Sequence, residues 1–116
     1  MWHVLVVDDD PEIAELFQSI LDGAGYRVSV ALNGQDALAL DAPDPIDALV
    51  TDVAMPGMDG RELLAALRER HPDLPALIVS GYPGRDLVDR PRERVLFKPI
   101  RLMALVNHLE TLLGER

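Results

Sequence analysis

Six polar residues stand directly after, or at the end of, short apolar runs that are typical of buried β-strands. They are Asp8, Asp9, Asp10, Asp52, Ser80 and Lys98. Ligands of open parallel sheets bind outside the carboxyl ends of the strands, so these side chains can converge on one site. Carboxylates gathered there repel each other unless a cation lies among them. An oxygen-only ligand set suits Mg²⁺, with Mn²⁺ as a substitute, so these residues predict a metal site.

A hydroxyl and an ammonium beside such a metal add what phosphoryl transfer needs. Ser80 can donate a hydrogen bond to a phosphoryl oxygen, and Lys98 can neutralise its charge. Lys98 is the only lysine among eleven basic residues. Its flexible stem can follow a carboxylate that becomes a phosphoryl group better than a rigid guanidinium can. Asp10 precedes Pro11, and Asp59 precedes Gly60, so we expect these two carboxylates to serve as helix caps or turn residues.

The spacing of the apolar residues alternates between strand-like and helical patterns, which is typical of a parallel sheet with crossover helices. The expected strands cover residues 3–7, 27–31, 46–51, 76–80 and 94–97. The expected helices run from near residue 10 to 23, and over about 35–40, 61–70 and 102–113. Between residues 80 and 94, glycines, prolines and a shortage of apolar residues predict that a further helix is short or mobile.

The composition excludes several kinds of site. Without cysteine there is no disulfide, thiolate metal site or cysteine nucleophile. Residues 1–60 hold twelve acidic residues against one basic residue, and the net charge of −9 argues against direct binding of nucleic acid or of an anionic membrane. No apolar run has the length of a membrane span, and we expect a cytoplasmic protein. His3, His71 and His108 fall on separate elements, so we expect solvated or helix-end roles for them.

Five short motifs make the sequence resemble the receiver domain of two-component response regulators. They are Val6-Val7-Asp8-Asp9-Asp10-Pro11-Glu12, Asn33-Gly34, Asp52-Val53-Ala54-Met55-Pro56-Gly57-Met58-Asp59-Gly60, Ser80-Gly81 and Lys98-Pro99-Ile100. The resemblance implies an α/β, flavodoxin-like (βα)5 fold with three layers and parallel strands in the order 2-1-3-4-5. We expect residues 1–116 to form a single receiver domain without an output domain, of the stand-alone or hybrid-kinase type.

The resemblance also implies roles for the site residues. Asp52 would accept a phosphoryl group from a phosphohistidine on a histidine kinase or a histidine phosphotransfer protein. Asp9, Asp52 and the backbone carbonyl of Ala54 would hold Mg²⁺, and Asp8 would act through a water on the metal. The domain would catalyse only its own phosphorylation and dephosphorylation, and would signal to a downstream protein partner by changing its conformation.

The same resemblance assigns Lys98 to pair with Asp52 and then with a phosphoryl oxygen. Ser80 would receive another phosphoryl oxygen, and the peptide bond between Lys98 and Pro99 would be cis.

The resemblance draws attention to three further positions, of which one differs from the usual family pattern and two affect how fast the phosphoryl group is hydrolysed. Val95 stands where family members usually carry a Phe or Tyr ring that reports phosphorylation. Phe97 and Tyr82 are the neighbouring aromatic residues that could replace it, and Phe97 shares the face of Val95 only if its strand is regular. Ala54 and Tyr82 occupy positions that tune hydrolysis. Since neither side chain orients an attacking water, we expect a long-lived acyl phosphate with Tyr82 as a partial cover.

Basic residues gather between positions 85 and 101. Arg92, Arg94 and Arg101 belong to this group, which is either a solvated face or a docking surface for a partner or a second copy in a homodimer.

Two other functions stay open from the sequence. One is a small phosphatase of the haloacid dehalogenase type, with Asp8 as nucleophile and Asp10 as acid, although Pro11 and Glu12 stand where a small hydroxyl residue would be expected. The other is a receiver-like scaffold that binds partners without being phosphorylated.

Overall fold

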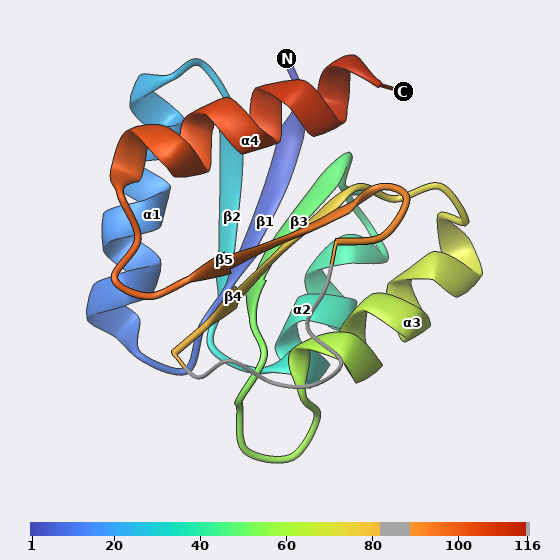
Figure 1. Cartoon of the computed structure of the whole chain (residues 1–116). Helices are drawn as coiled ribbons and strands as arrows, with labels where there is room; N and C mark the ends of the chain where they lie inside the picture. Colours follow the sequence, from blue (N-terminus) through green and yellow to red (C-terminus); the bar gives the residue numbers. More distant parts are fainter. Residues whose placement is uncertain (82–88, 116) are drawn as a thin grey trace.

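The computed structural model describes residues 1–81 and 89–115, and its centre is a single five-stranded sheet (Figure 1). The strands are β1 (His3–Val7), β2 (Arg27–Ala31), β3 (Ala48–Asp52), β4 (Ala76–Ser80) and β5 (Glu93–Phe97). They lie in the order β2-β1-β3-β4-β5, and all neighbours are parallel. The predicted fold class and strand order are therefore confirmed.

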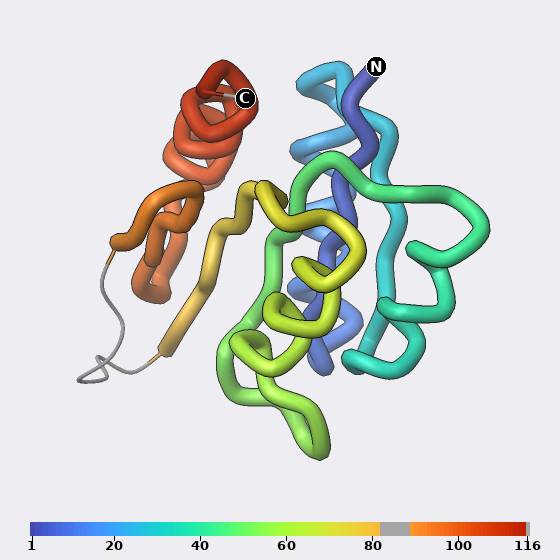
Figure 2. The backbone as a smooth tube through the Cα atoms, turned by 90° about the vertical axis from the view of Figure 1, so that its right-hand side faces the viewer, coloured from blue at the N-terminus to red at the C-terminus, as the bar shows by residue number. Residues whose placement is uncertain are grey.

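Helices cover both faces of this sheet and make the three expected layers (Figures 1 and 2). Their bounds are α1 (Pro11–Gly23), α2 (Gly34–Asp41), α3 (Gly60–Arg70) and α4 (Leu102–Gly114). Side chains of α1 and α4 pack in one apolar cluster with Val4 and Val6 of β1. Side chains of α2 and α3 pack in a second cluster with Leu5 and Val7. Because successive strand residues point to opposite faces and both faces are covered, β1 is buried throughout, which explains the apolar run from Val4 to Val7.

Each of the first three helices begins at a side chain that accepts a backbone hydrogen bond. Asp10 caps α1 by accepting from the N–H of Glu12 at 3.0 Å, and Asn33 caps α2. Asp59 forms a capping box with Glu62 at the start of α3. The capping roles predicted for Asp10 and Asp59 are confirmed. Each carboxylate accepts a hydrogen bond from a backbone N–H in the first turn of its helix.

Two strands differ in their bounds from the predictions. β3 spans Ala48–Asp52 instead of residues 46–51. At its start the N–H of Ile46 donates to the side chain of Asp41 at 3.0 Å, and at its end Asp52 still pairs in register with Val79 of β4. β5 begins one residue early, at Glu93, which pairs in register with Ala76 of β4. On the other side of β5, the N–H of Val95 donates to the carboxylate of Asp89 at 2.9 Å.

The further helix expected between residues 80 and 94, and the predicted cover residue Tyr82, fall largely on residues 82–88, which lie outside the described residues. None of the helices within the described residues has the length and apolar character of a membrane span.

The expectation of a solvated or helix-end role was wrong for His3. Its side chain is buried, with Nε2 2.7 Å from the Ser29 hydroxyl and Nδ1 3.1 Å from the Pro45 carbonyl oxygen. These two partners satisfy both ring nitrogens inside the protein, which a reading of neighbouring residues alone does not reveal. His71 does lie at a helix end, since it is the C-terminal cap of α3.

A buried carboxylate joins the ends of α2 and α3. Asp41 is 1% exposed and accepts hydrogen bonds from the N–H of Ile46 at 3.0 Å, from Arg70 at 3.0 Å and from Nε2 of His71 at 2.9 Å. Burial alone would raise the pKa of the Asp41 carboxyl, but these donors hold the pKa below its usual value. The ionised form of Asp41 therefore stabilises the fold.

We expect Asp41→Asn to lower the free energy of unfolding by about 2 kcal/mol at neutral pH, because the buried negative charge that pairs with Arg70 and accepts from His71 is lost. The stabilising effect of a carboxyl with a lowered pKa is present above the unfolded value, about 4, and is lost as the pH falls through the folded value. Urea unfolding from about pH 6 to about pH 3 should therefore show a smaller acid-dependent loss for the variant. The matched control is Asp22→Asn, at an exposed carboxyl of α1. Equal pH dependence of Asp41→Asn and the unmodified chain would contradict this role.

Candidate functional site

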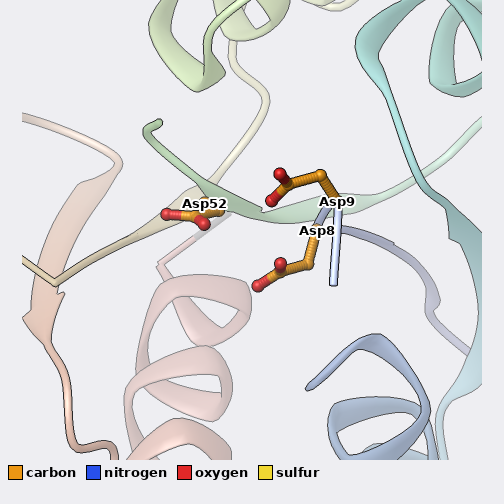
Figure 3. Close-up of side chains that lie close together, drawn as sticks. All are labelled: Asp8, Asp9 and Asp52. Atoms are coloured by element: carbon orange, nitrogen blue, oxygen red, sulfur yellow. The ribbon is translucent and has the colours of Figure 1, made fainter. Parts of the chain in front are cut away.

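Three carboxylates meet at the carboxyl edge of the sheet (Figure 3). Asp8 and Asp9 follow the last residue of β1, and Asp52 is the last residue of β3, the strand that pairs with β1. One oxygen from each carboxylate lies within 4.8 Å of the other two. Asp8 is 2% exposed and Asp52 is 8% exposed, whereas Asp9 faces solvent. This arrangement has an open side through which a ligand can approach.

Asp8 holds its charge in a buried and only partly satisfied position. Its Oδ1 accepts from the N–H of Asp10 at 2.9 Å, whereas its buried Oδ2 has no hydrogen-bond partner among the described residues. Burial raises the pKa of the Asp8 carboxyl, and the charges of Asp52 and Asp9 raise it further, against the lowering effects of the Asp10 N–H and of Lys98. A buried oxygen of this kind is suited to a cation, so the three carboxylates fit the expected Mg²⁺.

Lys98 supplies a positive charge from the other side of the site. Its Nζ lies 3.4 Å from Oδ2 of Asp52 and 3.8 Å from Oδ2 of Asp8. Its backbone N–H donates to the carbonyl oxygen of Ser80 at 2.7 Å, which continues the pairing of β5 with β4. The peptide bond between Lys98 and Pro99 is cis, as expected. The register of β5 therefore determines where the ammonium lies.

Ser80 and Ala54 come from the elements beside Asp52. Ser80 is the last residue of β4 and is 5% exposed, and β4 pairs with β3. Ala54 is exposed in the loop of residues 53–59, which connects β3 to α3. The structure thus brings the residues proposed for metal binding and phosphoryl binding to one edge of the sheet.

Gly60 allows that loop to close tightly on the end of β3. Its N–H donates to the carbonyl oxygen of Val53 at 2.9 Å. A β-carbon at this position would collide with the carbonyl oxygen of Asp52, so a residue with a side chain cannot occupy it without moving the strand end. Gly60 is therefore required for close approach at the site.

Val95 occupies the position at which family members usually carry an aromatic ring. Val95 is half-buried and packs against the apolar cluster of α2 and α3. β5 pairs regularly with β4 from Glu93 to Phe97, so Phe97 lies on the same face as Val95, and its side chain is 47% exposed. The condition for Phe97 to act in place of the usual ring is therefore met, whereas Tyr82 lies outside the described residues.

Two of the three arginines named as a partner surface form ion pairs with acidic side chains. Arg92 lies 3.7 Å from Asp73, and Arg94 lies 3.1 Å from Glu115. Arg101 is exposed at the residue before α4 and makes no side-chain cap.

Sequence reasoning missed Glu93, which is 5% exposed and forms an ion pair with Arg68 of α3. Residues two apart in a strand point to the same face, so Glu93 lies on the inward face that Val95 occupies. This alternation was the signal in the sequence that could have identified Glu93 as buried.

The comparisons with known proteins agree with this geometry. Residues 4–110 match the family model of the response regulator receiver domain. The chain belongs to the response regulator receiver family. Receiver domains of two-component systems act in phosphorelay signalling, so the chain is a signalling domain.

Relatives and solved structures are similar to this chain in sequence and in fold over most of its length. It is 36% identical to the response regulator receiver protein CpdR of Brucella abortus, over 97% of this chain and 98% of that protein. It is 38% identical to the response regulator MprA of Mycobacterium avium, but spans only 50% of that relative. The structure of the chemotaxis protein CheY4 of Vibrio cholerae has a TM-score of 0.89 and 29% identity, with 97% of this chain and 98% of that chain covered. The receiver domain of the hybrid histidine kinase CckA has a TM-score of 0.84 and 30% identity, with 96% and 98% covered.

We expect Asp8→Asn to stabilise the metal-free protein, by on the order of 1 kcal/mol, because a like charge is removed while the amide oxygen still accepts from Asp10. Thermal unfolding with and without Mg²⁺ measures the effect, and Mg²⁺ should raise the melting temperature of the unmodified chain much more than that of the variant. Asp10→Asn is the matched control, since asparagine also caps helices. A lower melting temperature of Asp8→Asn in the absence of metal would contradict the electrostatic argument.

Proposed function

We propose that Asp52 accepts a phosphoryl group from the phosphohistidine of a histidine kinase or a histidine phosphotransfer protein. The observation that carries the proposal is the placement of Asp52, which lies 3.4 Å from the Lys98 ammonium and within 4.8 Å of the other two carboxylates. A carboxylate oxygen of Asp52 attacks phosphorus, the phosphorus–nitrogen bond breaks, and the bonding electrons stay with the imidazole of the donor, which leaves as the neutral ring because its other nitrogen is already protonated. The product is an acyl phosphate on Asp52.

The proposed ligands of Mg²⁺ are Asp9, Asp52 and the backbone carbonyl oxygen of Ala54, and Asp8 would complete the metal site through a water on the metal. The bound metal would neutralise negative charge on the phosphoryl oxygens. Lys98, which pairs with Asp52 before transfer, moves its ammonium to a phosphoryl oxygen afterwards. The protein's own chemistry is limited to gaining and losing this phosphoryl group, so we propose that it is a signalling domain rather than an enzyme acting on a separate substrate.

The proposal includes the surroundings of the domain. We assign it to the cytoplasm, where kinases that use ATP produce phosphohistidine. Residues 1–116 act as one receiver domain, and the signal passes to a protein partner. With Val95 in place of an aromatic residue, the exposed ring of Phe97 is the group that we propose to report phosphorylation.

Incubation with a small acyl phosphate and Mg²⁺, followed by mass spectrometry of peptides, tests the acceptor. We expect the label on Asp52, and we expect Asp52→Asn to lose it completely, since an amide is not a nucleophile towards phosphorus under these conditions. Asp59→Asn is a matched control, because Asp59 caps α3 and asparagine preserves the cap. Label on Asp8 would instead support the phosphatase alternative, and the absence of Mg²⁺-dependent label would support the scaffold alternative.

We further propose that Arg92, Arg94 and Arg101 contribute to the docking surface for the downstream partner or for a second copy in a homodimer. Arg92 and Arg94 are partly exposed and pair at the surface with Asp73 and Glu115, and exposed ion pairs of this kind can exchange for carboxylates of a partner at little cost.

Reversing both charges, Arg92→Glu and Arg94→Glu, should weaken binding of the partner or dimerisation about tenfold or more, because the introduced glutamates would repel the carboxylates with which these arginines are proposed to pair. Calorimetry with a partner found by phosphotransfer profiling, and sedimentation for the dimer, measure the two cases. Arg27→Glu is the matched control, since it also breaks an ion pair, with Asp44, but at the opposite edge of the sheet. Unchanged affinity and unchanged dimerisation would remove this surface from the proposal.

A further inference from the structure

The loop of residues 53–59 touches a second element besides its own strand and helix. The side chain of Met58 lies directly over Gly34, the first residue of α2. A β-carbon on Gly34 would come within 2.7 Å of the Met58 sulfur and 3.0 Å of its Cβ and Cγ. Only a residue without a side chain therefore allows Met58 to lie in its present position.

α2 gives this contact a fixed support, because both ends of the helix are held. Asn33 caps its first turn, accepting from the N–H of Asp36 at 2.8 Å. Its last residue, Asp41, is bound by Arg70 and His71 at the end of α3. If a β-carbon at position 34 pushed Met58 away, the loop would therefore move more than the helix.

The loop is also restrained where it leaves and enters regular structure. Gly60 is bonded to the carbonyl oxygen of Val53, and the N–H of Val53 donates to the carbonyl oxygen of Val79 at 3.0 Å. Met55 is buried in the apolar cluster of α2 and α3, and Met58 packs against the same cluster. The segment that contains Ala54 thus lies between anchors, and the Met58–Gly34 contact ties it to the start of α2.

We propose that the Met58–Gly34 contact positions the loop, and with it the carbonyl oxygen of Ala54, for binding Mg²⁺. Gly34 and Met58 are then positioning residues of the metal site, although neither supplies a ligand. The proposal rests on the proposed function, in which Ala54 is one of the ligands. Mg²⁺ demands nearly ideal octahedral geometry, whereas Ca²⁺ accepts irregular and longer coordination. A loop displaced by a few tenths of an ångström should therefore impair Mg²⁺ binding more than Ca²⁺ binding.

Gly34→Ala is the direct test, because alanine is ordinarily better than glycine within a helix, so helix propensity alone predicts no damage. The matched control is Gly114→Ala in α4, where a β-carbon would meet no atom of residues 1–81 or 89–115 within 4 Å. Calorimetric titration of the full chain with Mg²⁺ and, separately, with Ca²⁺ gives the affinities. We expect Gly34→Ala to lower the Mg²⁺ affinity about tenfold and the Ca²⁺ affinity much less, and Gly114→Ala to change neither.

Met58→Ala completes a double-mutant cycle. Alone, it removes the contact and should lower the Mg²⁺ affinity to a smaller extent. Combined with Gly34→Ala, it should restore part of the lost affinity, because the displaced sulfur and Cγ are gone, so the two effects will not add. Circular dichroism confirms that each variant is folded. If Gly34→Ala does not fold, Met58→Ala alone decides, through its ratio of Mg²⁺ to Ca²⁺ affinity.

An unchanged Mg²⁺ affinity in folded Gly34→Ala, or an equal loss for the two metals, would overturn the positioning role. In that case the unmodified chain would still bind Mg²⁺ and label on Asp52. If the unmodified chain itself bound no Mg²⁺, the proposed function would fail, and these two failures are therefore distinguishable.

Discussion

Repulsion between carboxylates at one edge of the sheet is the constraint on which the rest of the site depends. Asp8 and Asp52 are buried, so solvent screens their mutual repulsion only weakly, and Asp9 lies beside them. Parallel strands that are buried on both faces hold these residues in place, so the fold does not relieve the repulsion by moving them apart. The Lys98 ammonium offsets only part of the negative charge, and a divalent cation is the natural complement.

The sequence was sufficient wherever local rules decide the structure. The strands β1, β2 and β4 have the predicted bounds because two-sided burial or a half-buried edge leaves a clear apolar pattern, and Asp10 and Asp59 cap helices because capping depends on neighbouring residues. It was insufficient for His3, Asp41 and Glu93. Their burial depends on partners 25 to 42 positions away in the chain, among them Pro45, Arg70 and Arg68, and no local pattern identifies such partners.

α3 connects several of these features. Its first residue, Gly60, closes against the end of β3, and Arg68, in its last turn, pairs with the buried Glu93 at the start of β5. Lys98 directly follows that same strand. A single helix therefore contacts the strand that carries Asp52 and the strand that leads to Lys98, which makes the distance between the two charged groups a property of the packed core rather than of flexible loops.

The side chain of Asp89 also affects how the protein behaves at high concentration. β5 is an edge strand of the sheet, and edge strands with free backbone donors recruit strands of other molecules. The Asp89 carboxylate occupies the outward N–H of Val95, and like-charged carboxylates of two molecules would repel each other there. Sheet extension from one molecule to the next is thereby disfavoured at this edge. Association at the Val95 position of β5 consequently favours contacts made by side chains, which can be selective, over backbone pairing, which is the same in every protein.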